Sequence, residues 1–256
     1  MIHKTAIIDE SAKVGEGVTV GAYSIIAANV EIGAGTQVGP HVVINGPTCI
    51  GEQNKIFQFS SIGEAPQDKK YNGEPTRLIV GDRNVIRECV TINRGTVSGI
   101  GKTVIGSGNL FMASCHVAHD CIVGNNTTFA NYAALAGHVE VDDFAILGGF
   151  TAVHQFTRIG RHSLCGLGSV VSQDILPFST AVGDRARAIG INKEGLRRNG
   201  FAEDLIVALH QAFRVLIKSK SPRQDAFEKL QSLCAKYPEV KECVDFIKQS
   251  KRGIAQ

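Results

Sequence analysis

The chain lacks the cysteine spacing that marks a disulfide framework or a zinc ribbon. It has seven cysteines, an odd number, and no two of them form a C-x-x-C pair. It also has no apolar run that approaches the length of a signal-peptide core or a membrane span. We therefore expect a reduced, cytoplasmic protein without a membrane span.

A strong excess of charge of either sign is missing as well. Lysine and arginine number 27 against 24 acidic residues, which gives a formal net charge of +3. This balance is too small to argue for nucleic acid, so we expect no nucleic-acid partner. It still allows a local basic patch for an acidic partner.

What the sequence does contain is a repeat of six residues. From Ile105 to Val171 a large apolar residue stands at every sixth position, and the stretches Ile2 to Ile62 and Val80 to Ile92 keep the same spacing. Glycine often follows the apolar residue. This period is typical of a parallel β-helix, in which each short strand turns one large side chain inward and a glycine-permitted corner follows.

The repeat is interrupted twice, over residues 64–79 and 96–102. A solenoid accommodates insertions as loops on one face, and loops on a rigid scaffold are where binding residues concentrate. The first loop contains Asp68 and Lys70, although both loops can equally be plain surface excursions. We expect the β-helix, with these two loops, to occupy residues 1–190.

Beyond the repeat the apolar period becomes helical. Apolar residues from Leu205 to Leu216 recur at helical spacing, Ser221-Pro222 ends that segment, and Pro238 divides the remainder. We expect a C-terminal α-helical domain of about three helices over residues 191–256. Its simplest role is to cap the open end of the coil and to help subunits pack.

Candidate chemistry lies in the segments CHVAHDC, LAGHVE and AVHQF, which hold the four histidines His116, His119, His138 and His154. With three strands per coil, residues 18 apart stack vertically about 4.8 Å from each other. Asp120 then lies beneath His138, and His119, Gly137 and Gln155 form one column. Polar corners can also merely decorate a coil.

Two chemistries fit this cluster, and spacing alone does not choose between them. In one, His119 is a general base held by Asp120, and Gly137 offers a backbone N–H to a developing oxyanion, as acyl transfer requires. In the other, His116, His119 and a third histidine bind zinc in a hydratase site. A structural solenoid without catalysis is a third alternative.

A resemblance to a known family rests on longer runs: GEPTRLIVGDRNVIRECVTINRGT, HVAHDCIVGN, LAGHVEVDDFAILGG, TAVHQF and NKEGLRRNGF. Together they resemble the UDP-N-acetylglucosamine acyltransferases, the enzymes that begin lipid A synthesis, over essentially the whole chain. The resemblance implies a left-handed parallel β-helix of hexapeptide repeats, assembled as a homotrimer with active sites between subunits. The period itself gives the coil and not its hand.

The implied reaction transfers an (R)-3-hydroxyacyl group from acyl carrier protein to the 3-hydroxyl of UDP-N-acetylglucosamine. It needs no metal, and no cofactor beyond the phosphopantetheine that the carrier protein brings. The resemblance makes His119 the general base, Asp120 the residue that orients its ring, and Gly137 the oxyanion donor. It assigns substrate contacts to Asp68, Lys70, His116, His138, His154, Gln155 and Arg198.

The sequence departs from the family pattern at two of the expected binding positions. Asn93 stands where the family usually has a histidine, and Asn199 where it often has a second arginine. A similar N-acyltransferase of the same pathway carries an extra N-terminal domain, whereas here the repeat begins at Ile2. We therefore expect the O-acyltransferase and keep the N-acyltransferase and a metal-dependent hydratase as alternatives.

The length of the acyl group depends on where its channel ends. Leu167 stacks above Gly149 on another edge of the coil, 48 residues beyond His119. At about 4.8 Å per coil of 18 residues, that is roughly 13 Å along the axis, which about ten carbons span. By resemblance, a bulky residue in this region stops the chain, which favours acyl groups of about ten to twelve carbons. Leu164 or Arg185 can set the stop instead.

Overall fold

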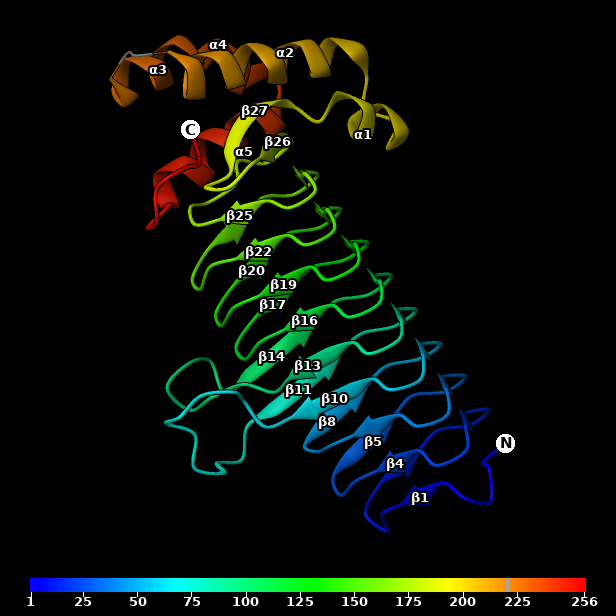
Figure 1. Ribbon diagram of the computed structural model, residues 1–256. Coiled ribbons are helices and arrows are strands. Elements are labelled where there is room, and N and C mark those ends of the chain that lie inside the picture. Colours follow the sequence, from blue (N-terminus) through cyan, green and yellow to red (C-terminus); the bar gives the residue numbers. More distant parts are fainter. Residues whose placement is uncertain (220–221) are drawn as a thin grey trace.

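The computed structural model describes residues 1–219 and 222–256. Most of it is a three-sided coil of short parallel strands with helices stacked on its C-terminal end (Figure 1). Successive strands belong to successive sheets, so every third strand pairs with the one a coil below.

The first sheet contains β1 (Ile7–Ile8), β4 (Ile25–Ile26), β7 (Val43–Ile44), β10 (Ser61–Glu64), β13 (Thr91–Asn93), β16 (His116–Val117), β19 (Ala134–Leu135), β22 (Ala152–Val153) and β25 (Val170–Val171). The second contains β2 (Lys13–Val14), β5 (Val30–Ile32), β8 (Thr48–Ile50), β11 (Arg77–Val80), β14 (Lys102–Ile105), β17 (Ile122–Val123), β20 (Glu140–Val141) and β23 (Arg158–Ile159). The third contains β3 (Thr19–Val20), β6 (Gln37–Val38), β9 (Lys55–Ile56), β12 (Val85–Ile86), β15 (Leu110–Phe111), β18 (Thr128–Phe129), β21 (Ile146–Leu147), β24 (Leu164–Cys165), β26 (Ser179–Val182) and β27 (Arg187–Ile191).

The residues of the six-residue repeat form the core of this coil. Within the paired strands they stand opposite one another in register, as Ile26 does with Ile44 and Ile44 with Ile62. Ile44 and Ile62 are 0% exposed. The repeat therefore specifies both the strands and their register, because only one large side chain per strand points inward.

The glycine after the large apolar residue has a different role from the one expected. Gly21 is not in the left-handed region, and a Cβ placed on it would lie 2.5 Å from the nitrogen of Pro40 in the next coil. Glycine here permits close stacking of coils. The left-handed backbone conformation occurs two residues later, at residues that carry side chains, such as Tyr23 (φ 59°) and Asp120 (φ 58°).

The first excursion is shorter than predicted, and the second is shifted toward the N-terminus. Arg77 to Val80 pairs in register with Lys102 to Ile105, and β10 extends to Glu64, so these residues are strands. The loops cover residues 65–76 and 94–101 and protrude on the same side of the coil (Figure 1). They contact each other, since Arg94 Nε–H donates to the Tyr71 hydroxyl at 3.3 Å.

The prediction of about three C-terminal helices is wrong. The described residues hold five α-helices and one π-helical turn: α1 (Lys193–Arg198), α2 (Glu203–Phe213), η1 (Arg214–Lys218), α3 (Arg223–Lys229), α4 (Gln231–Lys236) and α5 (Pro238–Gln249). Three of them are only six or seven residues long, too short to show a helical period. Pro238 begins a helix as predicted. Ser221, predicted to end one, lies outside the described residues.

The helices pack on the last coil around a second apolar core that includes Phe178, Leu196 and Leu209. The C-terminal tail returns to the coil, where Ile254 forms a β-bridge with Asp174. Within residues 1–219 and 222–256, every helix is too short or too polar to cross a membrane.

Candidate active site

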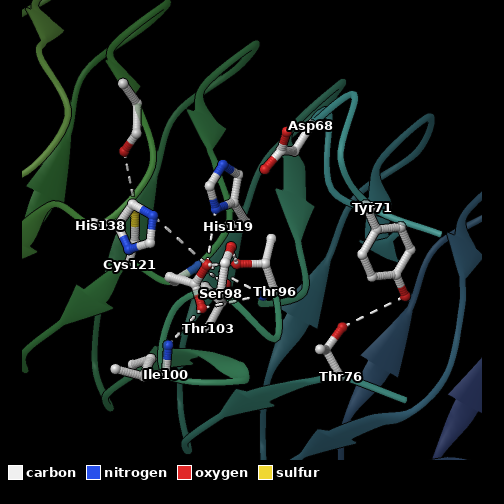
Figure 2. Close-up of polar contacts among 12 residues, drawn as sticks. Asp68, Tyr71, Thr76, Thr96, Ser98, Ile100, Thr103, His119, Cys121 and His138 are labelled. Atoms are coloured by element: carbon white, nitrogen blue, oxygen red, sulfur yellow. Dashed lines mark hydrogen bonds and ion pairs between the residues drawn. The ribbon is translucent and has the colours of Figure 1, made fainter. Parts of the chain in front are cut away.

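The predicted histidine cluster lies at the corner that follows the first sheet. The chain leaves β16 into His119 and Asp120, and one coil above it leaves β19 into Gly137 and His138. His138 N–H donates to the His119 carbonyl at 3.0 Å, so the two stretches stack in the predicted register. Figure 2 shows both imidazole rings on the same side of the coil.

His119, Asp120 and Gly137 are in contact. Nδ1 of His119 lies 2.8 Å from Oδ2 of Asp120, and the His119 side chain is 16% exposed. A Cβ on Gly137 would lie 2.6 Å from Cε1 of His119. A glycine is therefore required at position 137 for the ring to occupy its place, and Nε2 is the nitrogen left free of Asp120.

Asp120 is buried and held from several directions. Its carboxylate accepts hydrogen bonds from the Thr96 hydroxyl at 2.6 Å, the Thr96 N–H at 3.1 Å and the Ile100 N–H at 3.0 Å. Burial alone raises the pKa of Asp120, but the bonds from Thr96 and His119 lower it more, and the net pKa lies below the ordinary 3.8. Asp120 is therefore a carboxylate at neutral pH.

The two flanking histidines are kept neutral. Burial lowers the pKa of His116, assisted by the charge of His119, and its Nδ1 lies 2.7 Å from the Thr91 hydroxyl. Burial also lowers the pKa of His138, although the negative charge of Asp120 opposes the shift. The His138 ring stacks on Phe156, with centroids 4.5 Å apart.

The backbone N–H of Gly137 makes no hydrogen bond to any residue that the structure describes. Its carbonyl is used, because Phe156 N–H donates to it at 3.2 Å. An unpaired N–H next to the His119 ring is the geometry that an oxyanion donor requires.

Of the predicted substrate-binding residues in the first loop, Asp68 lies close to the cluster. Figure 2 shows its carboxylate beside the His119 ring, and its negative charge partly opposes the lowering of the His138 pKa that burial causes. The carboxylate accepts the Lys70 N–H at 3.0 Å, whereas the Lys70 side chain is exposed.

The other predicted contacts lie farther away within this chain. His154 and Gln155 are exposed at the same corner one coil above Gly137. Arg198 is exposed on α1, where it pairs with Glu194 at 3.1 Å. Figure 1 places α1 at the helical end, several coils beyond β16, so a single chain does not bring Arg198 to His119.

The two departures from the family pattern have local structural roles. Asn93 is 3% exposed, and its amide donates to the Ala65 carbonyl at 3.0 Å, which fixes the start of the first loop. Asn199 ends α1 and donates to the Gly195 carbonyl at 2.8 Å.

The candidate acyl-chain residues lie at a different edge from His119. Leu167 is 77% exposed at the corner after the third sheet, and its Cδ1 would lie 3.2 Å from a Cβ on Gly149, so the predicted stack is present. Leu164 is half-buried in β24, and Arg185 is exposed in the left-handed region.

The structure brings together only part of the expected metal-binding set. Among the described residues, His119, Asp120 and His138 offer ligand atoms within 4.8 Å of one another, and His116 is outside this group. The Asp120 oxygens already accept the donors of Thr96 and Ile100, which reduces their capacity to bind an ion.

Sequence reasoning missed Thr91, Thr96 and Ile100. Thr91 stands opposite His116 in the first sheet, 25 residues away instead of 18. Subtracting the seven residues of the predicted break at 96–102 restores the spacing of 18, so the signal was present. Thr96 and Ile100 lie in the loop itself, where no period applies.

Two family models match parts of the chain. Residues 174–255 match the model described as UDP-N-acetylglucosamine O-acyltransferase, domain 2, and residues 11–46 and 102–137 match the bacterial transferase hexapeptide model. The first match begins before residue 191, where we placed the start of the helical domain. That division of the chain stays a prediction.

Similar proteins match over the full length. An acyl-[acyl-carrier-protein]–UDP-N-acetylglucosamine O-acyltransferase of Thiobacillus denitrificans is 53% identical over 253 residues, 99% of this chain and 98% of the relative. One of Herminiimonas arsenicoxydans is 50% identical over 258 residues, again covering 99% of this chain and 98% of the relative. The solved structure of LpxA from Acinetobacter baumannii is 44% identical, with a TM-score of 0.97 over 100% of this chain and 99% of the other. This agreement confirms the expected left-handed parallel β-helix with C-terminal helices.

Proposed function

Because this chain belongs to the UDP-N-acetylglucosamine O-acyltransferase family, we propose that His119 is the general base of its acyl transfer. The reaction moves an acyl group from acyl carrier protein to UDP-N-acetylglucosamine and is the first step of lipid A synthesis. The observation that carries the proposal is the 2.8 Å contact between Nδ1 of His119 and Asp120, which leaves Nε2 free beside Gly137.

Each of the three residues has one task. Asp120 holds the proton on Nδ1, so Nε2 accepts the proton of the sugar 3-hydroxyl as its oxygen attacks the thioester carbonyl. The Gly137 N–H donates to the oxyanion that forms. When the tetrahedral intermediate collapses, the carbon–sulfur bond breaks and His119 returns its proton to the phosphopantetheine thiolate. No bond to the enzyme forms, and the only prosthetic group is the one on the carrier protein.

The substrates follow from the same family. The donor is an (R)-3-hydroxyacyl group on acyl carrier protein, and the acceptor atom is the 3-hydroxyl. Neutral His116 and His138 donate and accept hydrogen bonds to the sugar without repelling His119 when it is protonated. The remaining contacts to the nucleotide sugar come from Asp68, Lys70, His154, Gln155 and Arg198.

We place the enzyme in the cytoplasm as a homotrimer. Most outward positions of the first sheet form an apolar row, which Ser61, Thr91 and His116 interrupt midway. In this row Ile7, Ile25 and Val170 are 64%, 39% and 41% exposed in the single chain. The second sheet instead carries ion pairs such as Lys13 with Glu31 at 2.6 Å. Association through the apolar row buries it, and it brings the corner that holds His119 near a corner of a neighbour.

The proposal predicts that His119→Ala loses about 10² to 10⁴-fold in kcat, because only the proton acceptor is removed. The KM for UDP-N-acetylglucosamine and the melting temperature should change little. His3→Ala, at an exposed histidine far from the cluster, serves as the matched control. A variant that keeps more than a tenth of wild-type kcat would remove His119 from the role of base.

The cluster of His119, Asp120 and His138 leaves a metal-dependent hydratase as the second candidate, which the same assay separates. Acyl transfer should persist in enzyme dialysed against a chelator, with no gain from added zinc. An enzyme that transfers no acyl group but shows a hydration activity that disappears with the chelator and returns with zinc would instead favour the hydratase.

A further inference from the structure

The loop of residues 94–101 packs its inner side against the reacting cluster. Thr96 is 3% exposed, whereas Val97 and Ile100 on the outside of the loop are 62% and 50% exposed. The Thr96 hydroxyl, the Thr96 backbone N–H and the Ile100 N–H all donate to the Asp120 carboxylate. The loop is therefore built around one buried anion.

The loop also approaches Asp120 as closely as a backbone can. A Cβ on Gly99 would lie 2.4 Å from Cγ of Asp120 and 2.5 Å from both of its oxygens. On the opposite side, the Asp120 N–H donates to the Thr103 hydroxyl at 2.9 Å. The loop therefore fixes the carboxylate of Asp120 and Thr103 fixes its backbone, and any side chain at position 99 would displace the carboxylate.

The hydroxyl of Thr96 connects the loop to His119 through a chain of hydrogen bonds. Thr96 has one hydroxyl proton, and the 2.6 Å contact shows that it goes to Oδ2 of Asp120. The Ser98 hydroxyl, 3.1 Å away, then donates to Thr96. Oδ2 is also the oxygen that faces Nδ1 of His119 at 2.8 Å.

We propose that Thr96 is a positioning residue for the acyl transfer: it orients Asp120 so that Oδ2 holds the Nδ1 proton of His119. This inference rests on His119 being the general base. A carboxylate free to rotate would leave the His119 ring free to present either nitrogen, and a base in the wrong tautomer has no lone pair on Nε2. The second interruption of the repeat is thus a support for the catalytic aspartate.

The test compares Thr96→Val with wild type in the carrier-protein assay over a range of pH. Loss of a hydrogen bond to a charged group predicts a fall in kcat of about 10- to 100-fold, with KM for UDP-N-acetylglucosamine within about twofold. The acidic limb of the profile of kcat/KM should move to lower pH, because an Asp120 carboxylate that no longer faces Nδ1 stabilises protonated His119 less. Thr96→Ser, which keeps the hydroxyl, should restore both values.

Thr127→Val is the matched control. Thr127 is equally buried and donates to Asn109 at 2.7 Å, but it lies at another corner of the coil. It should lower the melting temperature without moving the pH profile. If Thr96→Val does not fold, Gly99→Ala tests the same carboxylate by crowding it and should show the same split between kcat and KM.

Several outcomes would overturn the positioning role. One is a kcat for folded Thr96→Val, or for Gly99→Ala, within twofold of wild type. Another is a fall in the kcat of Thr96→Val while the acidic limb of its kcat/KM profile stays in place and Thr96→Ser does not restore kcat. Either result with an inactive His119→Ala leaves the base assignment intact, whereas an active His119→Ala removes the base assignment whatever Thr96 does.

Discussion

Single residues at the corners decide what this coil can do. At one edge of the coil, the left-handed corner position carries Asp120 and His138 in two successive coils. At another edge it carries aromatic side chains, such as Tyr132 and Phe150. These side chains stack on their neighbours one coil away, with the Tyr132 and Phe150 rings 4.9 Å apart. The same backbone position thus provides packing on one edge and chemistry on another.

At this scale the sequence predicts well where the repeat is unbroken. His119, Gly137 and His138 fall where counting by 18 puts them, because no insertion separates them. Thr91 was missed since an insertion shifts its count. Thr96 has no counterpart in the count at all, because a loop side chain finds its partner through backbone geometry that spacing does not encode.

Leu167 provides the test of acyl length. Its side chain projects from the corner, 77% exposed, above the bare surface of Gly149. Leu167→Gly removes the four side-chain carbons and should move donor preference roughly two to four carbons toward longer hydroxyacyl chains. Mass spectrometry of the products from a mixture of hydroxyacyl carrier proteins measures the shift.

The comparison variant for that test is Leu164→Ala, at the other candidate stop. A change of profile in Leu164→Ala alone would place the end of the channel at the half-buried side chain of β24. An unchanged profile in both variants would mean that neither residue limits the acyl chain.

At the scale of elements, the strands were predictable and the helices were not. The position of each strand can be predicted from its one inward residue and from the pairing that repeats in every coil. Errors in the predicted strand boundaries arise only where a loop interrupts the repeat. The helices lack that repetition: α1, α3 and α4 are short, and η1 continues α2 with a different turn. Their boundaries depend on packing against the last coil, which the local sequence does not show.

His162 lies at the junction between coil and helices, and it predicts how that junction responds to acid. Its ring lies between Phe144 (4.6 Å) and Phe178 (6.0 Å), with Phe201 of the helical part at its edge (4.9 Å). Burial, followed by the charge of Arg161, lowers the pKa of His162 to about 4. The folded protein therefore holds this ring neutral.

The sign of the effect follows from proton binding. Between the unfolded pKa of about 6.5 and the folded value of about 4, the unfolded chain binds a proton that the folded chain does not, so stability falls as pH falls through this window. The full loss is about 3 kcal/mol. His162→Phe should remove this part of the pH dependence, measured by chemical unfolding at pH 7 and pH 5. An equal loss in both proteins would show that other groups cause it.

At the scale of the whole molecule, the chain distributes the predicted site residues over different edges and heights of the coil. His119 lies after the first sheet, Leu167 after the third, and Arg198 beyond the last coil. We therefore expect a site that uses all three to need a second copy. In the proposed homotrimer the apolar row of the first sheet is the contact surface, so assembly and catalysis are predicted to depend on each other.

Mixed trimers test whether the first loop acts across a subunit boundary. Lys70 is exposed, and its side chain makes no hydrogen bond or ion pair among the described residues, which fits a phosphate or carboxylate partner beside a neighbouring chain. Lys70→Ala and His119→Ala should each be nearly inactive. After equal amounts are unfolded and reassembled together, a shared site is complete when an intact Lys70 meets an intact His119 on the next chain. Random assembly gives this at about a quarter of sites, so about a quarter of wild-type activity should return.

Lys69→Ala, at the adjacent exposed lysine, is the control and should be active alone. Verified mixed trimers without recovery would show that each chain uses its own Lys70 with its own His119.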